Sequence, residues 1–209
     1  MKIVLTIVSL ALLLCACEPA EVTRGREHYE NLCSLCHGDQ GQGYISPKAN
    51  ALTNQDFIAT ASDEFLTIAI EQGRPETKMG AYGVDWLGPL DAQGVSDLIA
   101  FMRSYQEVDI ELDESWTAAD EGAELGSGLE LYERHCSFCH GDTAQGDAAL
   151  SLNNRTFLSS VSDDFLRYAI ARGRRATAMG AYDVSLSAKE IADLVLAIRS
   201  FGETTGESR

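Results

Sequence analysis

Two short stretches of the chain, residues 29–38 and 132–141, contain residue types at a spacing that can bind haem covalently. The first holds Cys33, Cys36 and His37 in the pattern Cys-x-x-Cys-His. Two thiols separated by two residues can bond to the two vinyl groups of one porphyrin, and the His that follows can supply an axial ligand to its iron. The second stretch repeats the pattern with Cys136, Cys139 and His140. The sequence therefore predicts two covalently attached haem c groups.

Zinc sites and redox-active dithiols also use a Cys-x-x-Cys pair. A structural zinc site needs four ligands, however, and a dithiol has no use for a His directly after its second Cys. Because the whole five-residue motif occurs twice, haem attachment is favoured over both alternatives.

The sixth coordination position of each iron needs a second axial ligand. Apart from the two motif histidines and Met1, the candidates are Met79, Met102, Met179, His28 and His135. Only Met79 and Met179 recur at matching places, each within Thr-x-Met-Gly-Ala-Tyr, and we expect them to be the ligands. The alternative role for both is to fill gaps in the core.

The other three candidates are expected to have different roles. Met102 lies on an apolar helical stripe and is replaced by Ile198 in the second copy, which predicts core packing. His28 and His135 are the rivals for ligation by two histidines, but both precede their motif, and we expect them to face solvent.

The repeat extends well beyond the haem motifs. Residues 54–83 and 154–183 align at a constant offset of 100, with identities that include Phe57 and Phe157, and Phe65 and Phe165. The motif offset is 103 and the last-helix offset is 96, so the first half has three extra residues around 44–50 and four around 86–89. Insertions confined to loops support one shared helical frame.

Helix signals recur at the same places in both halves. Thr23 and Ser127 are predicted to cap the motif helices, while Ser62 and Ser162 cap the middle helices, which end at Gly73 and Gly173. Ser187 and Glu190 predict a capping box for the last helix. Each motif helix carries Gly-x-x-x-Tyr, in which the Gly leaves a notch where the apolar last helix can approach closely. The fold class predicted is all-α, with two tandem domains.

The domain boundaries follow from composition. We predict one domain over residues 17–106 and a second over 125–202, joined by residues 107–124, which contain eight acidic and no basic residues. Residues 203–209 are expected to form a loose polar tail. Each half is marginal for a core of its own, so we expect that neither half folds natively without haem.

The net charge of −16, from 32 acidic and 16 basic residues, argues against a nucleic-acid partner and favours partners with a basic face. Arg167, Arg172 and Arg175 are additional in the second half, which is therefore predicted to be locally basic.

Residues 1–16 resemble a secretory signal, with Lys2 followed by an apolar run too short to span a bilayer comfortably. The run ends in Leu14-Cys15-Ala16-Cys17, which resembles a bacterial lipoprotein box and predicts lipidation of Cys17. The alternative is an ordinary cleaved signal with incidental cysteines. Both interpretations place the mature chain outside the cytoplasm, in the periplasm, and leave no cysteine for a disulfide.

On these motifs the chain resembles class I cytochromes c, and its two-domain pattern is similar to the cytochrome c4 group, from about Arg24 to Phe201. The resemblance implies helices wrapped round each haem, with first and last helices crossing, and a Met about forty residues after the motif that closes the pocket. Met79 and Met179 lie 42 and 39 residues after their motif His.

Two departures from the family pattern concern prolines. Gly80 and Gly180 follow the expected ligands where the family commonly has Pro. The family also often places a Pro carbonyl against the motif His. Pro47 can serve in the first half, but the second half has no Pro there, so His140 needs another backbone acceptor.

Arg74 and Arg174 lie shortly before the two Met residues. Their guanidinium groups can pair with haem propionates, and the alternative is that they are solvated surface residues.

Ligation by Met and His leaves iron six-coordinate, with no open position for a substrate. The first hypothesis is therefore a periplasmic, lipid-anchored one-electron carrier between a membrane donor complex and a terminal oxidase or reductase, and not an enzyme. The alternatives are a haem-bearing subunit of a larger oxidoreductase complex, or a dihaem peroxidase or thiosulfate-oxidising enzyme.

Overall fold

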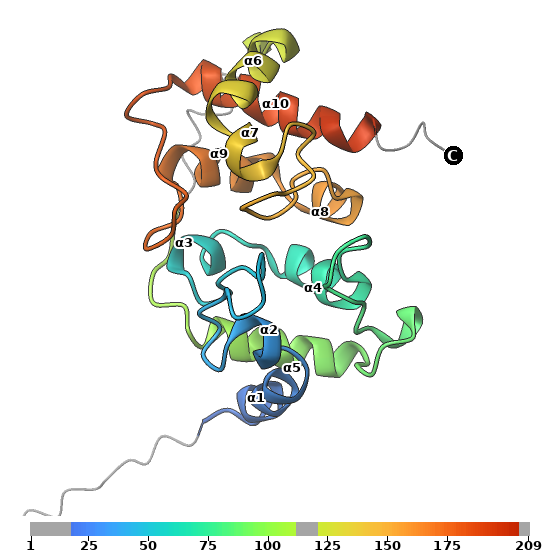
Figure 1. The fold of residues 1–209 in the computed structure, drawn as a ribbon. Helices are drawn as coiled ribbons and strands as arrows, with labels where there is room; N and C mark the ends of the chain where they lie inside the picture. The colour runs from blue at the N-terminus through green and yellow to red at the C-terminus, as the bar shows by residue number, and fades with distance from the viewer. Residues whose placement is uncertain (1–17, 112–120, 205–209) are drawn as a thin grey trace, which may run out of the picture.

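The computed structural model describes residues 18–111 and 121–204, and within these ranges the regular elements are helices (Figure 1). The predicted signal, Cys17, residues 112–120 of the acidic linker and residues 205–209 of the polar tail lie outside the described residues. The first half contains α1 (Ala20–Leu32), α2 (Ser34–His37), α3 (Gln55–Ile58), α4 (Asp63–Gln72), η1 (Val84–Trp86) and α5 (Ala92–Arg103). The second contains α6 (Leu125–His135), α7 (Ser137–His140), α8 (Arg155–Ser160), α9 (Asp163–Arg172) and α10 (Ala188–Thr204).

The first and last helices of each half cross at a glycine. A Cβ atom added to Gly25 on α1 would lie 1.9 Å from the carbonyl oxygen of Asp97 on α5. At the equivalent crossing of α6 and α10, a Cβ on Gly128 would lie 2.0 Å from the Asp193 carbonyl oxygen. No side chain fits at either distance, so the notch predicted from Gly-x-x-x-Tyr is confirmed in both halves.

The middle helices begin and end as predicted. Ser62 and Ser162 each accept a hydrogen bond from the backbone N–H three residues later, at 3.1 Å in both cases. Gly73 and Gly173 end the helices with φ of 66° and 69°, a left-handed conformation that glycine adopts without strain. The Ser187 and Glu190 capping box is also present, with its two reciprocal bonds at 2.8 and 3.3 Å.

The predicted starts of the motif helices were wrong. α1 begins after Pro19 and α6 after Glu124, so Thr23 and Ser127 lie inside the first turn of each helix. Pro19 has no N–H to satisfy and its fixed φ suits a helix start, which moves the start upstream of Thr23. The last helix is likewise longer than predicted, because α10 reaches Thr204 and includes the first residues assigned to the tail.

The two halves pack against each other through their middle helices, with α3 and α4 of the first half facing α8 and α9 of the second (Figure 1). Four buried phenylalanines form the centre of this contact. Phe65 and Phe165 lie 5.3 Å apart between ring centroids, and each contacts the other half's Phe157 or Phe57 at 6.0 Å. The repeat pairs Phe57 with Phe157 and Phe65 with Phe165, so the interface has approximate twofold symmetry. The buried apolar residues of both halves therefore form one hydrophobic cluster.

Candidate functional site

Both Cys-x-x-Cys-His motifs lie at a break between two helices. Cys33 ends α1 with φ −117° and ψ −36°, and its N–H bonds to the Tyr29 carbonyl at 2.9 Å before α2 begins. Cys136 has φ −119° and ψ −35° at the end of α6, with the same bond to Tyr132 at 2.8 Å. The two motifs thus have the same backbone conformation, as their shared sequence predicts.

The four motif cysteines are half-buried and form no disulfide. Burial raises the pKa of Cys33 to about 12 and that of Cys136 to about 11. A buried thiol with a raised pKa is a weaker nucleophile, because the thiolate is the reactive form.

Each motif histidine is held by a backbone carbonyl. The Nδ1 atom of His37 lies 2.9 Å from the Asn50 carbonyl oxygen, and that of His140 lies 2.9 Å from the Leu150 oxygen. A carbonyl only accepts, so Nδ1 carries the proton and Nε2 keeps its lone pair. Burial lowers the pKa of both imidazoles, against a smaller opposing effect of these bonds, which favours the neutral, ligating form.

This arrangement corrects the expectation for Pro47. The acceptor in the first half is Asn50, and the equivalent acceptor in the second half is Leu150. Any residue supplies a carbonyl, so neither half needs a proline. The three extra residues of the first half fall between the motif and this acceptor, as predicted, and the shared geometry is restored after them.

The loops that carry Met79 and Met179 are closed by matching hydrogen bonds. Arg74 N–H donates to the Met79 carbonyl at 2.8 Å, and Thr77 Oγ1 accepts from the Met79 N–H at 3.1 Å. In the second half the corresponding distances are 2.9 Å, from Arg174 to Met179, and 3.1 Å. Both Met side chains are half-buried. The Thr-x-Met segment therefore forms the same tight loop twice.

Two pairs of tyrosines, which were not among the predicted site residues, form hydrogen bonds to the motif segments. Tyr29 and Tyr132 are buried and donate to the Gly38 and Gly141 carbonyls directly after the motif histidines, at 2.6 and 2.9 Å. Tyr82, three residues after Met79, donates to the Leu32 carbonyl at 3.1 Å, and Tyr182 donates equivalently to His135 at 3.0 Å. These bonds tie each Met loop to its motif helix. Their repetition in both halves was the available signal.

The rival ligands are placed elsewhere. Met102 is 4 % exposed within the core, as predicted. His28 and His135 are half-buried rather than solvent-facing. His28 lies beside Gly94 of α5, and the ring of His135 packs edge-on against Tyr182 at 5.7 Å.

Arg74 and Arg174 both lie at the contact between the halves. Arg74 stacks over Phe65 and Phe157, at 5.2 and 5.6 Å from the ring centroids, and Arg174 stacks over Phe165 at 4.7 Å. Burial lowers the pKa of each guanidinium to about 10. Nη1 of Arg74 is buried without a hydrogen-bond partner among the described residues, and a haem propionate fits this unsatisfied donor.

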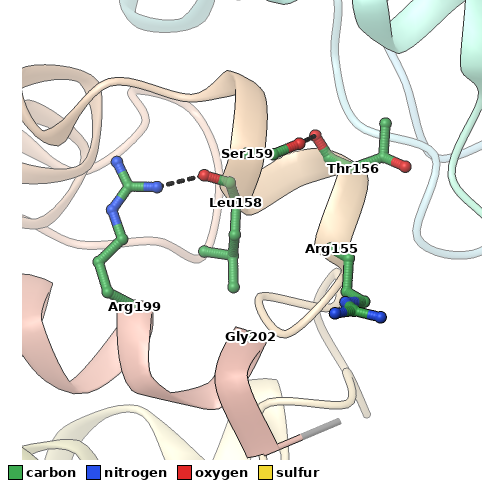
Figure 2. Close-up of a pocket in the computed structure, with 6 residues that line it drawn as sticks. All are labelled: Arg155, Thr156, Leu158, Ser159, Arg199 and Gly202. Carbon is green, nitrogen blue, oxygen red and sulfur yellow. Dashed lines mark hydrogen bonds between the residues drawn. The ribbon is translucent and has the colours of Figure 1, made fainter. Parts of the chain in front are cut away.

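The pocket in Figure 2 lies on α8 and α10 of the second half, and none of the predicted haem-binding residues lines it. Its lining is Arg155, Thr156, Leu158, Ser159, Arg199 and Gly202. Arg199 donates to the Leu158 carbonyl and pairs with Asp163, just as Arg103 donates to Ile58 and pairs with Asp63. The arginine contacts in the pocket therefore join the last helix to the middle helices in both halves, and we interpret them as structural.

Two further properties concern residues 18–111 and 121–204 only. No helix there is both long and apolar enough to cross a membrane. No group of three or more His, Cys, Asp or Glu side chains in those ranges is arranged to hold a metal ion.

Two known proteins are similar in sequence to this chain. Subunits named CcoP of cbb3-type cytochrome c oxidases are 29 % identical over 137 residues in Azospirillum sp. (strain B510) and 25 % identical over 136 residues in Azospirillum brasilense. These matches cover 62 % and 61 % of this chain but 42 % of each relative. The chain therefore spans less than half the length of these relatives.

Two solved structures are also similar. The reducing HAO-like protein complex Kustc0457/Kustc0458 of Kuenenia stuttgartiensis matches with a TM-score of 0.47 at 18 % identity, covering 85 % of this chain and 95 % of that one. Cytochrome CL of Methylophaga aminisulfidivorans matches with a TM-score of 0.35 at 27 % identity, covering 44 % and 72 %.

A family profile matches well over half of the chain, in two ranges that each contain one Cys-x-x-Cys-His motif. The family is described as Cytochrome C oxidase, cbb3-type, subunit III, and the ranges are residues 20–102 and 123–196. The chain is therefore an electron-transfer protein of the dihaem class I c-type cytochromes, with two tandem domains and two covalently attached haem c groups, and it belongs to the family of cbb3-type cytochrome c oxidase subunit III.

Proposed function

We propose that this protein relays single electrons outside the cytoplasm, between a membrane donor complex and a terminal oxidase. The observation that carries the proposal is the twofold occurrence of one arrangement: a neutral motif histidine fixed by a carbonyl, and a Met loop tied back to the motif helix by a tyrosine. Bound haem supplies a one-electron iron couple. A chain that fills both axial positions leaves no position for a substrate.

The proposal gives the equivalent residues of the two halves the same roles. The thiols of Cys33, Cys36, Cys136 and Cys139 would form the thioether bonds, and the iron would be held by His37 and Met79 in the first half and by His140 and Met179 in the second. Arg74 and Arg174 hold the propionates. A soft thioether ligand favours reduced iron and raises its potential, which suits a donor to an oxidase. Because no position is open, we propose that the protein is not an enzyme by itself.

A second candidate function is a haem-bearing subunit of a cbb3-type oxidase complex, and the family match favours it. The two CcoP relatives are named as oxidase subunits, and this chain aligns with less than half of each. Electron transfer by the two haems is common to both candidates. Copurification with an oxidase through gentle detergent extraction would favour the subunit, and release as a single chain would favour the carrier.

We also propose that the chain is exported to the periplasm and held to a membrane by a lipid on Cys17. The sequence Leu14-Cys15-Ala16-Cys17 supports this anchor. Redox partners with a basic face suit the net charge of −16.

Replacing the proposed thioether ligands tests the function directly. Met79→Ala and Met179→Ala should each remove about half of the Met-to-iron charge-transfer absorbance of the oxidised protein, because each leaves one of two equivalent centres without its sulfur ligand. The measurement is an absorption spectrum combined with a redox titration of the exported holoprotein. Met102→Leu is the matched control, since Met102 is in the core, and its spectrum should equal that of the wild type. An unchanged spectrum in either alanine variant would refute the assignment for that half.

A further inference from the structure

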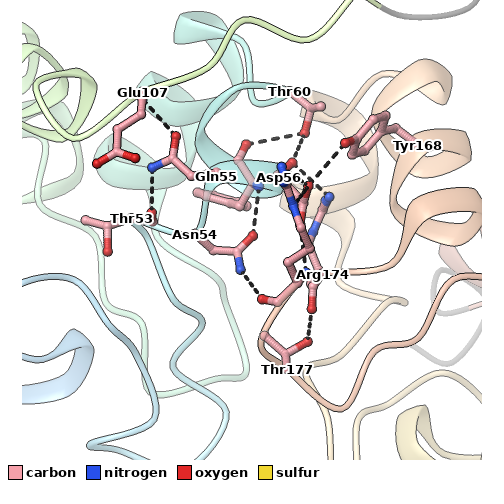
Figure 3. A network of polar contacts seen from close by, with 11 residues as sticks. Thr53, Asn54, Gln55, Asp56, Thr60, Glu107, Tyr168, Arg174 and Thr177 are labelled. Carbon is pink, nitrogen blue, oxygen red and sulfur yellow. Dashed lines mark hydrogen bonds and ion pairs between the residues drawn. The ribbon is translucent and has the colours of Figure 1, made fainter.

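One buried carboxylate crosses the contact between the halves, as Figure 3 shows. Asp56 belongs to α3 of the first half and is 2 % exposed. Its Oδ2 accepts from the Arg175 N–H at 2.7 Å, and its Oδ1 accepts from Arg175 Nε at 3.0 Å and from Tyr168 Oη at 3.1 Å. Arg174 Nη1 donates to the Asp56 backbone carbonyl at 2.9 Å. Every one of these donors belongs to the second half.

The repeat has no equivalent contact in the other direction. Positions 56, 75 and 68 of the first half correspond to 156, 175 and 168, so the mirror image of the Asp56 contacts would join Thr156, Pro75 and Ile68. Threonine has no charge, proline has no N–H and isoleucine has no hydroxyl. Asp56 therefore makes the interface asymmetric.

A second pair of cross-interface bonds is symmetric and provides an internal reference. Asn54 Nδ2 donates to the Arg175 carbonyl and Asn154 Nδ2 donates to the Pro75 carbonyl, both at 2.8 Å. Each half thus holds the other's loop by one neutral hydrogen bond. Among residues 18–111 and 121–204, a charged group of the opposite half holds the second half's loop alone. Charge-assisted hydrogen bonds are roughly twice as strong as neutral ones.

The loop held by Asp56 is the one that carries Met179. Arg174 N–H closes this loop on the Met179 carbonyl at 2.9 Å, and Arg175 is the next residue within it. A bond to the backbone N–H of Arg175 restricts the loop directly, without depending on a flexible side chain.

The contact with Asp56 also neutralises Arg175, and Arg167 and Arg172 are paired with Asp164 and Asp183. The locally basic character predicted for the second half is thus offset by paired carboxylates.

We propose that Asp56 is a positioning residue that acts across the interface: it restrains the loop that presents Met179, so that the thioether of the second half is displaced by an external ligand less readily than that of the first half. This inference rests on the proposed axial role of Met79 and Met179. In the exchange, one iron–sulfur bond is replaced by a bond from the incoming nitrogen, and no electron is transferred.

The test is a titration of the oxidised holoprotein with imidazole, followed by the nuclear magnetic resonance signals of the two iron-bound Met methyl groups. Phe138→Leu assigns these signals, because it lies between the motif cysteines of the second half and should shift only that half's signal. Phe138 is 89 % exposed and the first half has Leu35 at the equivalent position, so the fold should tolerate the change. In the wild type, the first half should lose its signal at lower imidazole concentration. In Asp56→Asn, the apparent affinity for imidazole should rise about fivefold in the second half and remain unchanged in the first.

Two further variants introduce residues that the other half already has at the equivalent positions. Arg175→Pro introduces the first half's own residue and removes both the N–H and the guanidinium donor, so it should reproduce the effect of Asp56→Asn. Thr156→Asp combined with Pro75→Arg builds the missing contact, and it should lower the imidazole affinity of the first half. This double variant also distinguishes a positioning role from a general loss of stability. A general loss would raise the imidazole affinity, whereas the added contact is expected to lower it in the first half.

Equal changes in both halves, or none in Asp56→Asn and Arg175→Pro, would overturn the inference. The proposed function fails by a different observation, namely a wild-type spectrum without Met ligation before any imidazole is added. The two outcomes are therefore distinguishable in the same samples.

Discussion

The two halves use the same backbone frame around each haem motif but neutralise the same buried carboxylate differently. Asp97 on α5 and Asp193 on α10 are equivalent, and both are nearly inaccessible. Asp97 receives two bonds from Arg24, at 2.6 and 2.8 Å, and one from Gln93. Asp193 receives the Glu124 backbone N–H at 2.7 Å and Lys189 at 3.0 Å. The aspartate is common to both halves, whereas its partners differ.

A second difference lies in the loop before the last helix. In the first half, the four additional residues contribute to η1 and a following turn in which Leu87 has φ of 66° and is 99 % exposed. The second half lacks these residues, yet both loops close with the same bond: Leu90 N–H donates to the Tyr82 carbonyl and Leu186 N–H to the Tyr182 carbonyl, each at 2.8 Å. The four additional residues leave the tyrosine bond to the motif helix unchanged. This difference in length therefore lies outside the Met loop.

The strongest test of the common frame is to fill the helix crossings. Gly25→Val and Gly128→Val should each destabilise the protein by about 3 kcal/mol or more, because even a Cβ would overlap the backbone of the facing helix. Thermal or urea unfolding measures the effect. Gly126→Ala on α6 is the control, since nothing lies within 4 Å of its added Cβ, and it should be neutral or stabilising by up to about 1 kcal/mol. Tolerance of valine at one crossing would show that the halves are built differently.

The next largest effect is expected at the interface, where the halves should respond alike. Phe65→Ala and Phe165→Ala should each cost about 3 kcal/mol or more, as expected for a buried phenylalanine. The double variant should lose less than the sum, with a coupling of about 1 kcal/mol from the direct ring contact. Urea unfolding of the four proteins in the cycle gives this value. Strict additivity would mean that the two rings do not stabilise each other.

The two halves should differ in how much stability they lose when the cation paired with their buried aspartate is removed. Arg24→Ala should lower the unfolding temperature more than Lys189→Ala, because Asp97 then keeps only Gln93, whereas Asp193 keeps the Glu124 backbone N–H. Calorimetry of the two variants measures the difference. Glu27→Ala, at an exposed position on α1, is the control and should have little effect. Equal losses would indicate that the backbone donor contributes nothing.

The smallest predicted effect is a pH dependence of the interface. Burial by itself raises the pKa of Asp56, but the hydrogen bonds from Arg175 and Tyr168 outweigh it and hold the pKa below its ordinary value of 3.8. A group with a lowered folded-state pKa stabilises the protein above its ordinary pKa, and this stabilisation is lost as the pH falls. The stability difference between wild type and Asp56→Asn should therefore be constant at neutral pH and shrink below about pH 4. Urea unfolding of both proteins across this range gives the difference, and a gap that widened in acid would contradict the sign.

Local sequence signals predicted the parts of the site that depend on neighbouring residues. The caps at Ser62 and Ser162, the stops at Gly73 and Gly173, and the notches at the helix crossings are all present. The starts at Thr23 and Ser127 were wrong, because several residues in each segment were compatible with an N-terminus. Pro47 was wrong for another reason. The acceptor for His37 is a carbonyl, which every residue has, so no side chain marks it in the sequence.

The sequence by itself determined the chemistry of this protein: two Cys-x-x-Cys-His motifs, two matching Met loops and the helices of a duplicated frame, since all of these are encoded by residue type and short spacing. Tertiary structure decided how the copies meet. Asp56 and Arg175 are far apart in the chain and belong to different halves, and no periodicity links them. Packing of the two halves, centred on the four phenylalanines, brings that carboxylate to the loop of Met179.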